Sequence, residues 1–356
     1  AELAAAIGYA GAILIITTSF GIGMAISAGA LVARALGAGD EALARHRASS
    51  TLVLGILAGA IFAAVVWVNL PALVALIGAS GETLDLAVAY LRIIIPSLPF
   101  LLVGMVGGAI LRAHGDARRA MMATVWGGVV NAVLDPILIF GLDLELTGAA
   151  LASVAARLAI AATALIPIFR YYGGLDRPAV LEVLADVRPV FAIAFPAILT
   201  QIATPIGQAY VTRSMAVYGE EAVAGMAIVG RLAPLAFGGL FAQSGAIGPR
   251  IGQNFGAGDI DRVRRAFRDG LIFTATVVLI ISAALFALRG PIEALFEIDG
   301  VARDLVFLFC GPLALVFFFN GLIFVSNAAC NNLGHPFYST WINWGRHTLG
   351  TIPFVL

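Results

Sequence analysis

The chain has 356 residues, of which 61% are hydrophobic and only 12% are charged, and its mean hydropathy is +0.99. A soluble domain carries roughly 25% charged residues, so the composition excludes a soluble globular domain and indicates a polytopic α-helical membrane protein. The formal net charge is zero and no long basic run occurs, which argues against a nucleic acid as partner.

Ten apolar stretches follow one another along the chain, and each is long enough to cross a bilayer as a helix. Short loops with glycine, proline and charged residues separate them. We therefore expect an all-α fold whose ten helices span the lipid bilayer. The stretches lie near residues 7–34, 50–77, 87–111, 119–140, 147–169, 189–217, 222–250, 266–288, 302–330 and 337–356.

Arginine alternates between the loops. All 21 basic residues are arginine, and most of them follow the first, third, fifth and seventh stretches, whereas the other loops are acidic. Cytoplasmic loops of membrane proteins carry an excess of basic residues. The odd-numbered loops are therefore predicted to be cytoplasmic.

An internal repeat is visible in the motif GAGD, which occurs at Gly37–Asp40 and again at Gly256–Asp259. In both copies we expect the glycine turn to end one helix and the aspartate to cap the next. Both copies fall in predicted cytoplasmic loops, so the two halves are parallel repeats, which typify transporters with a central site between two lobes.

This repeat predicts three parts: an N-lobe at residues 1–170, a cytoplasmic linker at 171–188, and a C-lobe at 189–356. The stretch 189–217 has no repeat counterpart before the start of the chain, and 147–169 has none after its end. A parent of six plus six helices is the simplest explanation, and the chain would then be a fragment that lacks the first and twelfth.

Asp135 is the one acidic residue placed inside an apolar stretch rather than at an end. Burying a carboxylate in hydrocarbon costs at least ~2.5–3.5 kcal/mol, so such residues usually face a bundle interior and are functional. Asn131 lies one helical turn earlier on the same face, and Pro136 should bend the helix. We predict a proton or hard-cation site at Asp135 and Asn131. The alternative is a structural aspartate at the outer mouth, bonded to the next loop.

Ser153, in the following stretch, is a third candidate for this site, although its hydroxyl could equally bond to its own helix backbone. Arg157 in the same stretch is expected to extend its side chain toward a membrane interface. No paired acids, histidine cluster or activated nucleophile appears at depth, so the chain is not expected to be an enzyme. Because Cys310 and Cys330 share one apolar stretch, neither a disulfide framework nor a metal site is predicted. No cofactor is predicted apart from a coupling ion.

The second half offers amides in place of a mid-membrane carboxylate. They either line a substrate cavity or join helices to one another, and both roles remain open. These amides are Gln201, Gln208, Gln243, Asn320 and Asn327.

Three segments together resemble the multidrug and toxic compound extrusion (MATE) family. They are NAVLDPILIFG at Asn131–Gly141, GAALAS at Gly148–Ser153, and GPRIGQNFGAG at Gly248–Gly258. The resemblance extends over essentially the whole chain. Within the family, the sequence is most similar in character to the bacterial branch that includes DNA-damage-inducible protein F. The family's twelve-helix plan agrees with two missing helices.

The resemblance implies a multi-pass antiporter of the bacterial inner membrane, with two six-helix lobes in a V-shaped bundle. It would act as a monomer and export amphiphilic or cationic drug-like molecules in exchange for protons or sodium. In the family, an acid of the first helix joins an Asn/Asp pair of the fifth helix in a cation site. Asn131 and Asp135 match this pair, and Ser153 falls where a threonine often contributes.

Two other functions are alternatives to drug efflux. A flippase for lipid-linked oligosaccharides or peptidoglycan precursors would share this general shape, but it should carry a more basic central cavity than these arginine-poor stretches suggest. A membrane-embedded enzyme would need more acidic or nucleophilic groups at depth than Asp135 alone.

Overall fold

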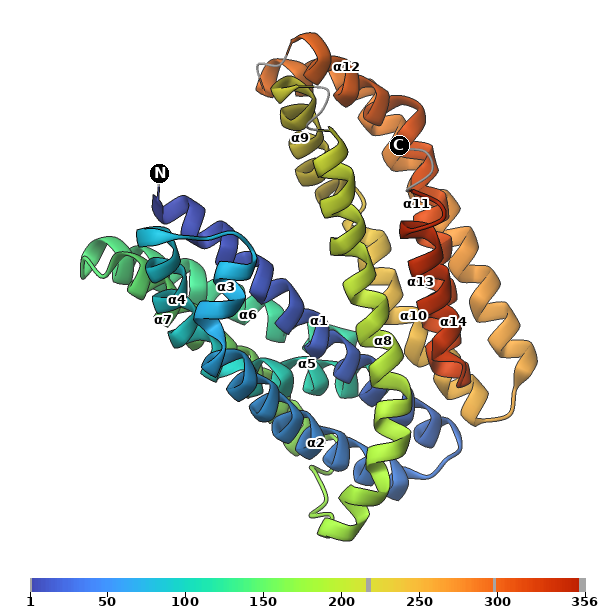
Figure 1. Cartoon of the computed structure of the whole chain (residues 1–356). Coiled ribbons are helices and arrows are strands. Elements are labelled where there is room, and N and C mark those ends of the chain that lie inside the picture. The colour runs from blue at the N-terminus through green and yellow to red at the C-terminus, as the bar shows by residue number, and fades with distance from the viewer. Residues whose placement is uncertain (1, 216–218, 297–298, 352–356) are drawn as a thin grey trace. The chain divides into compact units, whose positions relative to one another are not determined.

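The computed structural model describes residues 2–215, 219–296 and 299–351, and no strand occurs among them. The all-α prediction is therefore confirmed for this part of the chain. In chain order (Figure 1) the helices are α1 (Glu2–Gly37), α2 (Glu41–Val68), α3 (Leu70–Leu76), α4 (Gly81–Ile94), η1 (Ile95–Ser97), α5 (Leu98–Ala113), α6 (Ala117–Pro136), η2 (Ile137–Gly141), α7 (Glu145–Tyr171), α8 (Val180–Met215), α9 (Glu220–Ala236), α10 (Gly238–Gly256), α11 (Ile260–Phe296), α12 (Gly300–Leu308), η4 (Phe309–Leu313), α13 (Ala314–Leu333) and α14 (Pro336–His347).

Among the described residues, eight helices are long and apolar enough to cross a membrane. A ninth span results if α9 and α10, which meet at a 47° bend, are counted as one. The tenth expected span, at 337–356, contains α14, but residues 352–356 lie outside the described part. That span stays a prediction.

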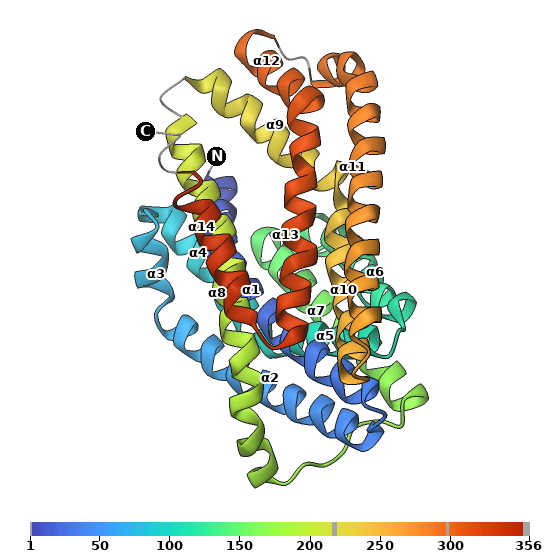
Figure 2. The same cartoon turned by 90° about the vertical axis from the view of Figure 1, so that its right-hand side faces the viewer.

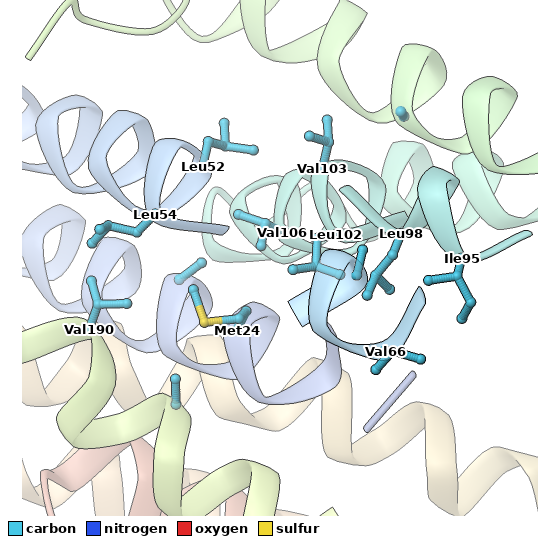
Figure 3. Close-up of a cluster of buried hydrophobic side chains, with 14 of the residues drawn as sticks. Met24, Leu52, Leu54, Val66, Ile95, Leu98, Leu102, Val103, Val106 and Val190 are labelled. Atoms are coloured by element: carbon cyan, nitrogen blue, oxygen red, sulfur yellow. The ribbon is translucent and has the colours of Figure 1, made fainter. Parts of the chain in front are cut away.

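Unit 1, residues Ala1–Ile198, is one of two compact units of the chain. Its core lies where α1, α2 and α5 pack together, and Figure 3 shows Met24, Leu52, Leu102 and Val106 in this cluster. A Cβ added to Gly59 would lie 2.9 Å from the Leu102 side chain. Small residues on α2 therefore let α5 approach closely, which is how helices gain packing energy inside a membrane.

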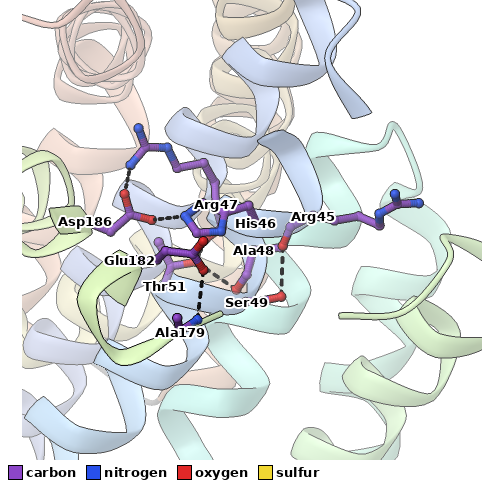
Figure 4. A network of polar contacts seen from close by, with 9 residues as sticks. All are labelled: Arg45, His46, Arg47, Ala48, Ser49, Thr51, Ala179, Glu182 and Asp186. Atoms are coloured by element: carbon purple, nitrogen blue, oxygen red, sulfur yellow. Dashed lines mark hydrogen bonds and ion pairs between the residues drawn. The ribbon is translucent and has the colours of Figure 1, made fainter. Parts of the chain in front are cut away.

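α8 begins at Val180 and continues unbroken to Met215, so the end of the expected linker at 171–188 is helical. Its first half packs within unit 1. Ser27 donates a hydrogen bond to the Val190 carbonyl at 2.8 Å. Asp186, only 4% exposed, forms an ion pair with Arg47, and its Oδ2 lies 3.2 Å from His46 Nε2 (Figure 4). The division between the two compact units falls after Ile198, inside α8, and the predicted lobe bounds stay a prediction.

Unit 2, residues Leu199–Leu356, is built around α10, α11 and α13, which lie side by side (Figure 2). An aromatic cluster fills one end of its core. The Phe237 and Phe317 rings stack with centroids 4.2 Å apart, and Phe309 meets Phe317 edge-on at 5.9 Å.

Both GAGD copies adopt the predicted turn. Gly39 and Gly258 have φ values of 78° and 73°, in the left-handed region that glycine tolerates. Asp40 accepts a hydrogen bond from the backbone N–H of Leu43 at 2.8 Å, and Asp259 accepts one from Arg262 at 2.9 Å. The repeated motif thus encodes the same helix end and the same N-cap in each unit.

Candidate functional site

Asp135 and Asn131 lie on the last turns of α6, within the span Ala117–Gly141, and both side chains are half-buried. At 1.5 Å per residue, Asp135 is about 27 Å along the helix from Ala117. If the arginine-rich end is cytoplasmic, the carboxylate lies in the outer half of the membrane. In the described part of the chain, no hydrogen bond or ion pair engages it.

The helix changes geometry directly after Asp135. Pro136 has no backbone N–H, so it cannot continue the ordinary ladder, and the next residues form the π-helix η2. Its wider turn is closed by the N–H of Leu142, which bonds to the Ile137 carbonyl at 2.9 Å. Such π-turns often occur at functional sites.

Two glycine contacts fix how α7 packs antiparallel to α6 and η2. A Cβ on Gly127 would lie 2.3 Å from the Ile160 side chain, and a Cβ on Gly148 would lie 2.7 Å from the backbone of Leu138. Between these contacts, the register sets Ser153 level with residues 133–134, between Asn131 and Asp135. The three predicted residues therefore occupy one depth on two packed helices, although no hydrogen bond joins them in the described structure.

The amides of unit 2 are distributed over several helix contacts. Gln243 joins α10 to α11, because its amide donates to the Gly270 carbonyl at 2.6 Å and accepts from Thr274 at 3.0 Å. Gln201 and Gln208 lie on α8, half-buried and exposed respectively. Their part in a substrate cavity stays a prediction.

Asn320 and Asn327, by contrast, both face α14. The Asn320 Oδ1 accepts a hydrogen bond from Arg346 Nη1 at 2.7 Å, and the Asn327 Oδ1 accepts one from Asn343 Nδ2 at 3.1 Å. These contacts form a polar seam between α13 and α14 that continues to α8, where Trp344 donates to the Leu199 carbonyl at 3.0 Å.

Sequence reasoning missed Arg346 as a member of this seam. It is half-buried, and within the described residues no carboxylate pairs with it. Counting from Pro336, the start of α14, Arg346 lies about 15 Å along the helix. Arg346 and Asn343 are three residues apart and therefore share one helix face. This spacing was the sequence signal that could have placed Arg346 in the seam.

The expected extension of Arg157 toward an interface is wrong. Its Nη1 donates to the Ile94 carbonyl and to Ser97 Oγ, both at 3.0 Å. The chain breaks there at η1, where the N–H of Leu98 bonds to Ile95 and leaves the Ile94 carbonyl without its helical partner. Since hydrocarbon offers no water to such a carbonyl, Arg157 and the Ser97 hydroxyl, at 2.7 Å, donate to it instead.

Replacing Arg157 with methionine should therefore destabilise the α4–α5 break. We expect the free energy of unfolding to fall by about 1–2 kcal/mol, as for loss of charged hydrogen bonds in a partly compensated site. Thermal unfolding in detergent measures the change. Arg118→Met, at an exposed position, should leave stability unaltered, and an equal loss in both variants would contradict the assigned role.

Comparison with known proteins agrees with this architecture. The family model MatE matches residues 2–137 and 196–354. The FAD transporter of Shewanella oneidensis is 26% identical over 358 residues, covering 99% of this chain and 79% of that protein. The multidrug export protein MepA of Staphylococcus aureus is 29% identical over 288 residues; the match covers 79% of this chain and 61% of that protein, less than two thirds of its length.

Solved structures show the same fold. A crystal structure of a mutant of the Vibrio cholerae MATE transporter VcmN aligns with a TM-score of 0.92 at 23% identity, covering 98% of this chain and 80% of that chain. A transporter of the MOP superfamily from Pyrococcus furiosus aligns with a TM-score of 0.89 at 22% identity, covering 99% and 79%. Because the family model covers most of the sequence, the chain belongs to the MatE family of multi-pass membrane transporters.

Proposed function

We propose that the protein is a secondary antiporter of the bacterial inner membrane that exports amphiphilic or cationic small molecules in exchange for protons or sodium. The similarity to MepA, a multidrug export protein, supports the substrate class. The observation that carries the proposal is Asp135: a half-buried carboxylate inside a membrane span, beside Asn131, for which the described structure provides no counter-charge.

An ionised carboxylate is costly in a low-dielectric environment, and binding a proton or a cation lowers that cost. Loaded and empty states of Asp135 would therefore favour different packings of α6, η2 and α7. The ion can shift this equilibrium only by its difference in affinity between the two states. Asn131 and Ser153 would supply neutral oxygen ligands for sodium, whereas a proton requires Asp135 alone.

Proteoliposomes test the proposal and distinguish the two ions. The protein should accumulate a fluorescent amphiphilic cation against its gradient when a pH gradient, a sodium gradient or both are imposed. If neither gradient drives accumulation while passive exchange of the dye still occurs, the antiport proposal fails. Serine-to-alanine and asparagine-to-alanine variants at Ser153 and Asn131 should impair sodium-driven transport more than proton-driven transport.

A second candidate substrate class is anionic. The relative from Shewanella oneidensis is an FAD transporter, and a dinucleotide carries phosphate charge that a cationic side chain would neutralise. Arg346, half-buried in the seam with Asn320, offers such a charge. Competition by FAD against the cationic dye separates the candidates, and Arg346→Gln should abolish competition by FAD only if this class is correct.

The flippase alternative remains open in the same experiment. A lipid-linked sugar pyrophosphate is also anionic, so Arg346 suits it equally well. A lipid-linked sugar that displaces the dye where FAD does not would favour flipping. No cofactor beyond the coupling ion belongs to the proposal, and the protein is proposed to work as a monomer.

A further inference from the structure

A groove of about 270 Å³ lies between α6 and α7, near the first turns of α6 and the last turns of α7. The part nearer the middle of the two helices is apolar and includes Met122, Trp126 and Ile166. Its mouth carries Arg119, Arg170 and Tyr171. This groove lies at the arginine-rich end of both helices, away from Asp135.

The groove has the polarity of a phospholipid. Trp126 lies about 10 Å further along α6 than Arg119, so a charged mouth is followed along the groove by aromatic and aliphatic side chains. Trp126 and Ile166 are 53% and 59% exposed, so their side chains are available to an apolar ligand. Tryptophan and tyrosine are enriched at this level of membrane proteins, where the headgroups begin.

The mouth carries one positive charge that the described structure does not neutralise. Arg119 is paired with Asp116, whose Oδ2 lies 2.5 Å from Arg119 Nη1 and also accepts a hydrogen bond from Tyr172 at 2.8 Å. Burial alone would raise the pKa of Asp116, but these hydrogen bonds outweigh it and hold the pKa below its ordinary value. The Asp116 carboxylate therefore stays ionised, and its negative charge neutralises Arg119.

Arg170 has no such partner among the described residues. Its guanidinium carbon lies 5.6 Å from the Tyr171 ring centroid, and that of Arg119 lies 4.0 Å from the same ring. The tyrosine thus holds both arginines near the mouth of the groove. Guanidinium groups bind phosphate through paired hydrogen bonds, and basic pockets between membrane helices bind anionic headgroups.

We propose that this groove binds one anionic phospholipid of the arginine-rich, cytoplasmic leaflet, with its phosphate on Arg170 and an acyl chain along Trp126 and Ile166. The bound lipid would join α6 to α7, the two helices that carry Asp135 and Ser153. The site is independent of the substrate and of the coupling ion.

Native mass spectrometry of the detergent-solubilised protein tests this site with phosphatidylglycerol and phosphatidylcholine. The unmodified protein should retain phosphatidylglycerol preferentially. Arg170→Gln should weaken that binding about fivefold, the equivalent of the ~1 kcal/mol that one arginine contributes near an anionic surface. Arg118→Gln removes a neighbouring exposed charge that does not line the groove, and it should leave binding unaltered.

Equal retention of the two lipids, or equal weakening by Arg118→Gln and Arg170→Gln, would overturn the proposal. So would displacement of phosphatidylglycerol by inorganic phosphate, because the groove would then be an ion site rather than a lipid site. Arg170→Gln should unfold at the same temperature as the unmodified protein without lipid. Trp126→Leu provides a second variant, which should weaken binding without changing the charge.

Discussion

Asp135→Asn should reduce ion-driven efflux at least tenfold while the protein continues to reach the membrane. The asparagine keeps the size of the side chain and its hydrogen-bonding groups, but it cannot carry the charge that a proton or a sodium ion neutralises. Efflux of a fluorescent amphiphilic cation from energised cells, at matched protein levels, measures the effect. Asp135→Glu keeps the carboxylate and should retain a measurable part of the activity.

Asp143→Asn is the matched control for this variant. Asp143 is an exposed acid just beyond η2, with a φ of 54° that asparagine also tolerates. The Asp143→Asn variant removes the same charge eight residues after Asp135, outside the predicted ion site, so it should leave efflux near its original rate. Undiminished efflux in Asp135→Asn, or an equal loss in Asp143→Asn, would remove Asp135 from the coupling step.

Gly148→Val should separate α7 from η2 and cause the largest loss of stability among the changes considered. A Cβ at this position would lie 2.7 Å from the backbone carbonyl of Leu138. Backbone atoms cannot turn aside as a flexible side chain does, so the helices must move apart. Overpacking of this kind costs about 1–3 kcal/mol or more, measured as a lower thermal unfolding temperature in detergent.

Efflux should fall with it, because the displaced helix carries Ser153 away from Asn131 and Asp135. Gly128→Val is the control, since a Cβ on Gly128 would meet no atom within 4 Å. If the two valine variants are equally stable, the close approach of α7 to η2 does not determine the geometry of the site.

Local sequence patterns were enough to predict the helices, the helix caps at the two GAGD motifs, and the position of Asp135 inside a membrane span. Hydropathy shows which stretches prefer lipid, and a single carboxylate within one of them is conspicuous in the sequence. The level of Ser153 relative to Asn131 and Asp135 was harder to foresee, because it depends on the register that Gly127 and Gly148 set between two helices.

Contacts between distant parts of the chain were not predictable. Arg157 was expected to reach an interface, yet it donates to the Ile94 carbonyl and to Ser97 at a helix break far away in the sequence. The partner of Asn320 is an arginine on α14, and Asp186 joins α8 to α2 through Arg47. Arg157 and Asn320 were visible in the sequence as polar groups inside apolar stretches, whereas Asp186 fell in the expected linker. In all three cases only packing fixed the partner.

The role of Asp135 in coupling is tested by comparing two activities of Asp135→Asn in the same proteoliposomes. Exchange of labelled for unlabelled dye at equal ion concentrations requires binding and reorientation only, whereas accumulation against a gradient also requires coupling. If Asp135 couples the ion to the substrate, the variant should retain exchange and lose accumulation driven by either a pH or a sodium gradient. Accumulation at the unmodified rate would contradict this role.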